Sequence, residues 1–258
     1  MTVEITLAGH RALVTGGGQG VGAGIATLLA AAGAHVVVND LHLARAQAVA
    51  DEIVATGGSA SAVAFDVADH AAVAAGVAAS GGIDILVNNA GNAGGDVWPP
   101  MVPFADTTPA DWLPFLRVNL DGVMNCVHAA LPGMIEQRWG RVITIVSDAA
   151  RTGSAYLAAY AAAKAGAAGF TRSVAHEVAR HGITANNIAL GTMRTPLSEA
   201  TWADPDNPRA KALMQQYLIR RPGLPADVAG LALFLASDAA DWITGQTYPV
   251  NGGFSFAL

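Results

Sequence analysis

The sequence predicts an α/β fold: a single Rossmann-type doubly wound parallel sheet of about seven strands, with helices on both faces. Two observations support this prediction. Short apolar runs rich in β-branched residues alternate with longer helical patterns along most of the chain, as in repeated βαβ units. A glycine-rich turn, residues 15–22, follows the first of these runs, where such a sheet passes from its first strand to its first helix.

Each expected strand is a short apolar run, and the expected helices lie between them. The expected strands are 12–14, 35–39, 60–65, 83–87, 141–146, 183–190 and 247–250. The expected helices include 21–32, 109–137 and 156–181. Small or polar residues come just past these strands: Gly16, Asp40, Asp66, Asn89, Ser147 and Gly191. Ligands gather at the carboxyl ends of parallel strands, so we expect these residues to share one site.

The composition indicates one globular domain spanning residues 1–258. Of the 258 residues, 52% are hydrophobic, and no linker rich in Pro, Ser or charge divides them. The 14 basic and 20 acidic residues give a formal charge of -6, which argues against nucleic acid as a partner. Cys126 is the only cysteine, so the chain forms no internal disulfide and no multi-cysteine metal site. We expect no bound metal.

The chain carries no recognisable targeting or membrane segment. Met1-Thr2-Val3-Glu4 lacks a basic stretch followed by an apolar core, which a signal peptide requires. No apolar run reaches the roughly 18 residues of a membrane span. A single cysteine also fits a reducing compartment. We therefore expect a cytoplasmic protein with no membrane partner.

The glycine-rich turn predicts a nucleotide site. Gly16, Gly20 and Gly22 allow a tight turn and the approach of a pyrophosphate to the amino end of the next helix. Asp40, at the end of the second strand, is placed to accept both adenosine ribose hydroxyls and to repel a 2′-phosphate. Leu41 follows it, and the glycine turn holds no Arg or Lys. These residues favour NAD over NADP, and we expect Arg45 on the exposed face of the next helix.

A second group of residues predicts acid–base chemistry. Tyr160 and Lys164 are four residues apart, so they share one face of a helix. A free tyrosine titrates near pH ~10, and a cation at ~4–6 Å lowers such a pKa by ~1–3 units. Ser147, thirteen positions before Tyr160, is a hydroxyl donor suited to hold an alcohol or carbonyl oxygen.

In their order and spacing, these segments resemble the short-chain dehydrogenase/reductase family over almost the whole chain. The resemblance implies a catalytic tetrad of Asn119, Ser147, Tyr160 and Lys164. In it, Tyr160 exchanges a proton with the substrate oxygen, Ser147 fixes that oxygen, and Lys164 lowers the tyrosine pKa and binds the nicotinamide ribose. Asn119 matches the family's Asn-x-x-Gly segment and implies a water relay to Lys164; the alternative is a bond to neighbouring backbone.

The resemblance also implies a set of cofactor contacts. They are Gly16, Gly18, Gln19, Gly20, Val21, Gly22, Asp40, Leu41, Asp66, Val67, Asn89, Ala90, Gly91, Tyr160, Lys164, Met193 and Thr195. Asp66 has a helix cap as its alternative role. The chain departs from the family at Leu190-Gly191, where Pro-Gly is usual. Without the proline we expect a looser turn that keeps the cofactor contact.

Three variable segments are expected around the substrate: 92–108, 149–157 and 193–222. The last is expected to form a substrate lid, and apolar residues such as Trp98, Trp202 and Leu218 suggest a fairly apolar substrate. Core packing or subunit contact is the alternative for each. Most basic residues of 193–222 are expected to be solvated; a cluster facing the cleft would suit an acidic substrate group. Arg151 either reads the substrate or forms a salt bridge with Asp148.

These observations predict an NAD-dependent oxidoreductase that acts on a secondary alcohol or ketone. The expected substrate is a hydroxyacyl thioester, such as a 3-hydroxyacyl-CoA or an alicyclic hydroxyacyl-CoA, or a hydrophobic cyclic alcohol. The alternatives are a sugar or polyol dehydrogenase and, from another class, a non-catalytic NAD-binding sensor. The closing segment 243–253 also matches the family, and relatives with this ending commonly form homotetramers, so we expect a homotetramer.

Overall fold

The computed structural model of the protein describes residues 5–91 and 102–256. Within them, seven parallel strands form one sheet in the order β3-β2-β1-β4-β5-β6-β7. The strands are β1 (Arg11–Val14), β2 (His35–Asp40), β3 (Ser59–Ala64), β4 (Ile85–Asn88), β5 (Gly140–Ser147), β6 (Ile183–Leu190) and β7 (Thr247–Val250). The α/β fold and its seven-stranded parallel sheet are confirmed. Trp98 and the rest of 92–101 lie outside the described residues.

The strand order reverses between β1 and β4. The chain builds outward from β1 to β2 and β3, then returns so that β4 pairs with the other side of β1. Such a reversal leaves a crevice at the carboxyl ends of the two strands, because their following connections run to opposite sides. The glycine-rich turn follows β1 and Asn89 follows β4, so both segments lie at this reversal.

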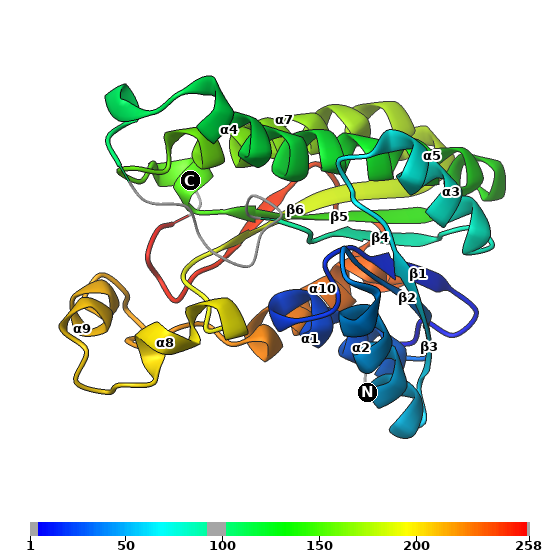
Figure 1. The fold of residues 1–258 in the computed structure, drawn as a ribbon. Coiled ribbons are helices and arrows are strands. Elements are labelled where there is room, and N and C mark those ends of the chain that lie inside the picture. Colours follow the sequence, from blue (N-terminus) through cyan, green and yellow to red (C-terminus); the bar gives the residue numbers. More distant parts are fainter. Residues whose placement is uncertain (1–4, 92–101, 257–258) are drawn as a thin grey trace.

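Helices cover both faces of the sheet, as Figure 1 shows. One face carries α1 (Gly20–Ala31), α2 (Leu43–Ala55) and α10 (Pro225–Ala236), and the other carries α3 (His70–Ala79), α4 (Pro109–Leu116), α5 (Gly122–Gln137) and α7 (Ala158–Val178). Successive strand residues serve opposite faces: Ala12 and Val14 join the core under α1, whereas Leu13 joins the core under α5 and α7. The sheet is therefore buried on both sides.

The helix expected over 109–137 is divided into two. α4 and α5 are separated by a π-helical turn, Arg117–Asp121, that contains Asn119. A π turn inserts one residue into the helical repeat, a difference that apolar periodicity does not register. The start of α4 is well defined, because Asp111 accepts the Thr108 backbone N–H at 2.7 Å and Pro109 occupies the first turn.

The helix expected over 156–181 begins later, at Ala158, and ends in a 3₁₀ turn, Ala179–His181. Tyr156 has φ +66°, a left-handed conformation that an α-helix excludes. The shift leaves Tyr160 and Lys164 in the first two turns of α7. Their expected spacing on one helix face is kept.

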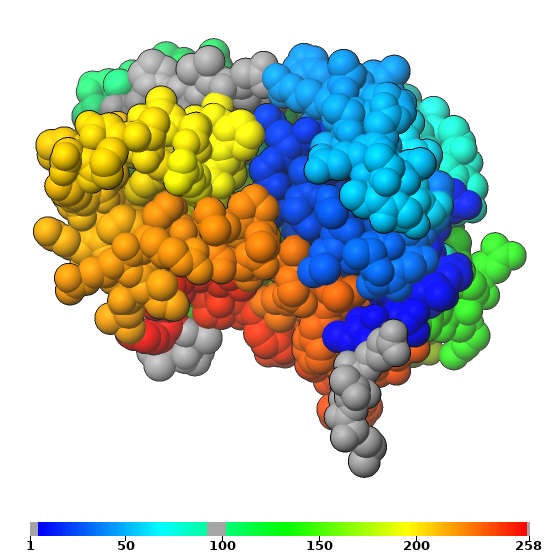
Figure 2. All heavy atoms as spheres, turned by 90° about the horizontal axis from the view of Figure 1, so that it is seen from below, coloured from blue at the N-terminus to red at the C-terminus, as the bar shows by residue number. Residues whose placement is uncertain are grey.

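The segment 193–222 extends beyond the edge of the sheet near α1 and holds two short helices, α8 (Glu199–Trp202) and α9 (Pro208–Met214). In Figure 2 this segment, yellow to orange, occupies one half of the face and the blue N-terminal elements occupy the other. Within residues 5–91 and 102–256, no helix has the length and apolar character that would cross a membrane.

Candidate active site

A cavity of about 1020 Å³ lies across the carboxyl ends of the strands. The residues expected there from sequence do meet in it: Gly16, Asp40, Asp66, Asn89, Ser147 and Gly191 all line its wall. Residues between Met193 and Leu213, in the segment 193–222, also line the cavity. These residues therefore lie together at one end of the strands, as expected, and their shared function stays a prediction.

Neighbouring atoms hold the glycine-rich turn in place and leave no room for a side chain at Gly16 or Gly22. Gly16 has φ +59°, and a Cβ there would lie 2.9 Å from the Ala90 Cα. A Cβ on Gly22 would lie 2.3 Å from the Gly16 carbonyl oxygen. The Asn89 side chain donates to the carbonyls of Thr15 and Gly16 at 2.9 and 3.0 Å. The turn is thus fixed against the end of β4, with the amino end of α1 facing the cavity.

Asp40 is buried at the end of β2, where its Oδ1 accepts the His42 backbone N–H at 3.0 Å. A Cβ on Gly18 would lie 2.7 Å from both Asp40 Oδ2 and Arg45 Cβ, so only glycine fits between them. Arg45 was expected on an exposed helix face, and that expectation is wrong. It is half-buried and lines the cavity, because the first turn of α2 faces the glycine-rich turn.

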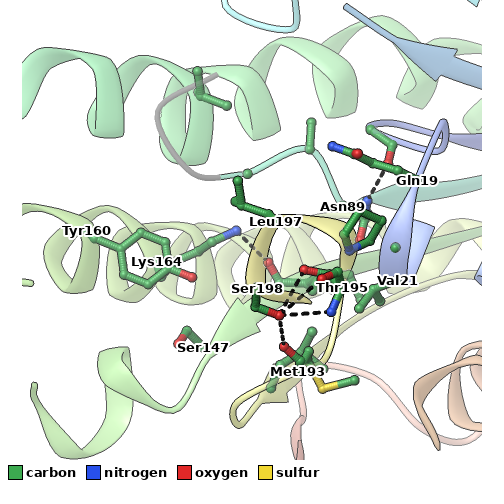
Figure 3. A pocket seen from close by; sticks show the side chains of 18 of the residues that line it. Gln19, Val21, Asn89, Ser147, Tyr160, Lys164, Met193, Thr195, Leu197 and Ser198 are labelled. Atoms are coloured by element: carbon green, nitrogen blue, oxygen red, sulfur yellow. Dashed lines mark hydrogen bonds between the residues drawn. The ribbon is translucent and has the colours of Figure 1, made fainter. Parts of the chain in front are cut away.

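Ser147, Tyr160 and Lys164 converge on the same cavity from two elements. Ser147 is the last residue of β5, while Tyr160 and Lys164 project from adjacent turns of α7 (Figure 3). The Lys164 side chain is buried, and its Nζ donates to the Ile145 carbonyl oxygen at 2.8 Å. The Phe115 ring meets the Tyr160 ring edge-on, with centroids 6.0 Å apart. The hydroxyls and the ammonium group are therefore held by strand, helix and aromatic packing.

The surroundings shift the titration of both ionisable groups. Burial lowers the pKa of Lys164 to about 8, because the interior disfavours the ammonium form. Desolvation raises the pKa of Tyr160, and a side-chain hydrogen bond with Ser147 opposes that rise. Lys164 was expected to supply the lowering. Among the described residues Ser147 supplies it, since the Lys164 ammonium faces the Ile145 carbonyl.

Asn119 lies behind the cavity wall and does not line it. It is fully buried in the π turn, and its Nδ2 donates to the Phe115 carbonyl at 2.9 Å, the local backbone bond that was the alternative role. A Cβ on Gly91 would lie 3.3 Å from Asn119 Oδ1 and 3.5 Å from Lys164 Nζ. Both polar atoms thus border Gly91, and the water relay to Lys164 stays a prediction.

The turn after β6 is not loose, contrary to expectation. The Gly191 N–H donates to the Val250 carbonyl at 3.1 Å, and the Thr192 N–H donates to the Tyr217 hydroxyl at 2.8 Å. The same hydroxyl donates to Thr192 Oγ1 at 2.8 Å. Neighbouring backbone and Tyr217 restrain the turn where proline is missing.

Met193 and Thr195 line the cavity as expected, and Ser198 organises them (Figure 3). Its hydroxyl donates to the Met193 carbonyl at 2.9 Å and accepts the Thr195 N–H at 2.9 Å. The Trp202 indole N–H also donates to Ser198 Oγ, at 3.1 Å. Sequence analysis missed Ser198, although Thr195-Pro196-Leu197-Ser198 has the pattern of a helix start that would have indicated it.

Arg151 anchors the C-terminal segment and does not reach into the cavity. Its guanidinium donates to Asp148 at 2.8 Å, to Ser255 Oγ at 2.8 Å and to the Phe256 carbonyl at 2.7 Å. Asp148, which is buried, also accepts from the Asn251 side chain at 2.6 Å. The salt bridge, and not substrate reading, is therefore the role that the geometry gives Arg151.

The remaining predicted contacts divide into lining and supporting residues. The lining residues are Gln19, Gly20, Val21, Leu41, Val67, Ala90 and Gly91. Gly18 and Gly22 support the wall from behind, as their packing shows. The lining residues that sequence analysis did not place include Asn39, His42, Phe65 and Thr192. Leu157, Leu197, Ser198, Thr201 and Leu213 lie in the segments expected around the substrate but were not named individually.

The fold and this site define a Rossmann-type nucleotide-binding protein. A family model described as Enoyl-(Acyl carrier protein) reductase matches residues 16–255. A 3-oxoacyl-[acyl-carrier-protein] reductase of Synechocystis is 40% identical over 248 residues, covering 94% of this chain and 95% of the relative. The chain belongs to the short-chain dehydrogenase/reductase family, whose members are oxidoreductases that use a nicotinamide dinucleotide.

Solved structures agree with this placement. A gluconate 5-dehydrogenase from Burkholderia cenocepacia, in complex with NADP and tartrate, has a TM-score of 0.89 and 37% identity, covering 99% of this chain and 98% of its own. A 3-oxoacyl (acyl-carrier-protein) reductase from Agrobacterium tumefaciens with NADP bound has a TM-score of 0.90 and 33% identity, with 98% of each chain covered. The similarity therefore extends over the whole length of these relatives.

Proposed function

We propose that the protein is an NAD-dependent oxidoreductase that transfers a hydride between the nicotinamide and a secondary alcohol or ketone. The observation that carries the proposal is the convergence of Ser147, Tyr160 and Lys164 on one cavity with the glycine-rich turn. Acid–base chemistry beside a dinucleotide requires a hydroxyl, a proton carrier and a cation, and this cavity brings one of each together.

The residues present suit such a cofactor. The side-chain-free turn at Gly16 and Gly20 and the amino end of α1 favour a pyrophosphate. When bound, the dinucleotide accepts or supplies the hydride. Tyr160 then takes up or donates the proton of the substrate oxygen, and the Ser147 hydroxyl holds that oxygen by a hydrogen bond. Lys164 presents its ammonium group to the nicotinamide ribose.

The preference for NAD rests on Asp40. Its buried carboxylate closes the end of β2 on the cavity wall, where it would accept ribose hydroxyls and repel a 2′-phosphate. Two observations favour NADP instead: Arg45 lines the same wall, and solved relatives carry NADP. Asp40 outweighs Arg45 in our proposal, because burial strengthens its repulsion of a phosphate and Arg45 is only half-buried.

The proposed substrate is a hydroxyacyl thioester or a hydrophobic cyclic alcohol. Apolar side chains on the substrate side of the cavity support it, among them Leu157, Leu197 and Trp202. The relatives named 3-oxoacyl-[acyl-carrier-protein] reductase point the same way. A sugar or polyol substrate is the second candidate. The hydroxyls of Thr192 and Thr201 in the wall, and the relative named gluconate 5-dehydrogenase, favour it.

We further propose that the chain is one catalytic domain, that the segment 193–222 acts as a lid, and that the enzyme is a cytoplasmic homotetramer. The two short helices of the segment, which border the cavity outside the sheet, support the lid role. Light scattering after size-exclusion chromatography measures the assembly directly. A monomeric mass would overturn the tetramer and leave the chemistry untouched.

The function is tested by Tyr160→Phe, which removes the hydroxyl and keeps the ring that packs on Phe115. We expect kcat to fall at least ~10²-fold, the usual contribution of positioned acid–base catalysis, with dinucleotide affinity within about twofold of wild type. NADH and NADPH formation at 340 nm would be followed over cyclic alcohols, hydroxyacyl thioesters and polyols. Retained turnover in the variant would refute the assignment. Cofactor binding without turnover of any substrate by the wild-type protein would favour the sensor.

A further inference from the structure

We infer that the substrate carries an anionic group, a carboxylate or phosphate, and that Arg209 of α9 binds it. This inference rests on the proposed function and defines its substrate class more closely. It starts from the distribution of charge around the cavity. At the cofactor end the wall holds Asp40, Arg45 and Asp66, and at the reacting centre it holds Lys164. Among the described lining residues from the segment 193–222, Arg209 is the only charged one.

Three of the other four cations of this segment are paired with carboxylates. Arg194 makes a bidentate pair with Glu199, at 2.9 and 2.5 Å. Lys211 binds Asp206 at 2.7 Å, and Arg221 makes a bidentate pair with Asp227, at 2.6 and 2.8 Å. None of these three cations lines the cavity. The fourth, Arg220, is exposed and does not line the cavity, so among the described residues of the segment Arg209 is the one cation that faces it.

Arg209 has no such partner in the part of the chain that the structure describes. Within residues 5–91 and 102–256, no carboxylate lies within ion-pair distance of its guanidinium. The substrate side of the described wall also contains no Asp or Glu. An arginine presents a planar, permanently charged fork that suits carboxylates and phosphates. We therefore expect a bound substrate to supply the negative charge that pairs with the Arg209 guanidinium.

The backbone under Arg209 is well supported, although the side chain itself is exposed. The Asn207 side chain accepts the backbone N–H groups of Arg209 and Ala210 at 3.0 and 3.4 Å. Ala210 and Met214 are buried on the inner face of α9, which fixes the helix against the rest of the segment. Arg209 therefore extends toward the cavity from a defined base.

The chemistry between Arg209 and the reacting centre narrows the substrate further. The wall near Arg209 also contains the apolar residues Leu197, Trp202 and Leu213. Trp202 and Leu213 are partly buried, and Leu197 is exposed. A substrate that contacts both ends would have a secondary alcohol or ketone at Ser147 and Tyr160, an apolar middle and an anionic end at Arg209. A free hydroxy acid and a coenzyme A thioester both meet this description, through a carboxylate and a phosphate respectively.

The test compares pairs of substrates that share the reacting group, one member anionic and the other neutral. One pair is a 3-hydroxyacyl-CoA and its N-acetylcysteamine thioester, which has the same reacting group and no phosphate. The other is a hydroxycyclohexane carboxylate and its methyl ester. For the anionic member that the wild type prefers, Arg209→Ala is expected to raise KM about two- to fivefold, the upper part of the range for an exposed ion pair. We expect kcat to stay within about twofold, and the neutral partner to be unaffected.

Arg220→Ala is the matched control, because Arg220 is an exposed arginine of the same segment that does not line the cavity. It should leave both KM values unchanged. Arg209→Lys should retain part of the discrimination, and added salt should reduce it. The pair that responds identifies the carboxylate or the phosphate as the group bound.

Equal KM values for charged and neutral partners in the wild-type enzyme would overturn the inference, as would an equal effect of Arg209→Ala on both. Either result leaves the proposed function standing, since that function is decided by turnover in the wild type and its loss in Tyr160→Phe.

Discussion

At the scale of single residues, burial decides how the candidate acid and base behave with pH. The pKa of Tyr160 is raised, so its hydroxyl is protonated at pH 7 and ready to donate in reduction. Oxidation needs the phenolate, whose fraction grows tenfold per pH unit below its pKa. Lys164, with a pKa of about 8, is charged below that pH and neutral above it. Its loss of charge weakens the proposed contact with the nicotinamide ribose.

The expected pH profiles follow from these signs. The logarithm of kcat/KM for alcohol oxidation should rise with a slope of about one between roughly pH 6 and 8 and flatten above, while reduction stays nearly constant below 8. Initial rates in both directions across this range measure it. Lys164→Met should remove the bend near pH 8. Parallel profiles in the two directions would contradict the assignment of Tyr160 as the proton carrier.

The sequence predicted the positions of those site residues that belong to a short local pattern. Asp40 follows a β-rich run and Tyr160 precedes Lys164 by one helical turn, and the structure puts all three on the cavity wall. The chemical environment was not predictable in the same way. Lys164 bonds to Ile145, nineteen residues away, and this contact exists only after β5 and α7 pack together.

At the scale of elements, the glycine-rich turn and α1 work only if they fit closely together. We expect Gly22→Ala to displace the turn, because the new Cβ would lie 2.3 Å from the Gly16 carbonyl oxygen and 2.4 Å from the Asn89 amide. Overpacking of this kind costs about 1–3 kcal/mol. Dinucleotide affinity should fall at least about tenfold, since 1.4 kcal/mol corresponds to that factor. Fluorescence titration with NADH measures it.

Gly230→Ala provides the control for this prediction. Gly230 is also a helical glycine, in α10, but a Cβ there meets nothing within 4 Å. Its replacement should leave affinity unchanged and stabilise the fold by about 0.5–1 kcal/mol. If both variants bind NADH like the wild type, the turn does not form the dinucleotide site.

Element boundaries show where sequence patterns stop being informative. The seven strands were predicted within about two residues, because most of them are apolar runs buried on both faces, with β3 and β7 more exposed at the edges of the sheet. The π turn around Asn119 was missed, since residues 109–137 keep a helical apolar period through the insertion. The turn after β6 was predicted to be looser because it lacks a proline. The Tyr217 hydroxyl that restrains this turn is 25 residues away from Thr192, so no local pattern reveals the contact.

At the scale of the whole molecule, distant segments are joined by buried polar contacts that no local pattern reveals. The prime example is Arg141 of β5, whose side chain is 1% exposed. Its guanidinium donates to the Ser237 and Gly140 carbonyls at 3.3 and 3.0 Å, and it binds the carboxylates of Asp238 and Asp241. In sequence Arg141 is an ordinary charged residue at the start of an apolar run. Its burial depends on residues 96 to 100 positions later.

Arg141→Met should therefore destabilise the protein as a whole and leave the chemistry intact. The side chain keeps most of its apolar bulk, but the Gly140 carbonyl loses the Arg141 donor, at about 1–3 kcal/mol. The Ser237 carbonyl also loses this donor but keeps the Ala240 N–H at 3.2 Å, so its loss adds less. The carboxylates of Asp238 and Asp241 are 74% and 64% exposed and can be hydrated, so they add little to the cost. We expect the free energy of unfolding to fall by about 2–4 kcal/mol, measured by reversible urea unfolding, and the Tm to fall by about 5–10 °C.

Arg172→Met is the control, because it alters an exposed arginine of α7 and should change neither quantity appreciably. If the two variants have the same free energy of unfolding, the contacts of Arg141 with residues 237–241 do not stabilise the protein.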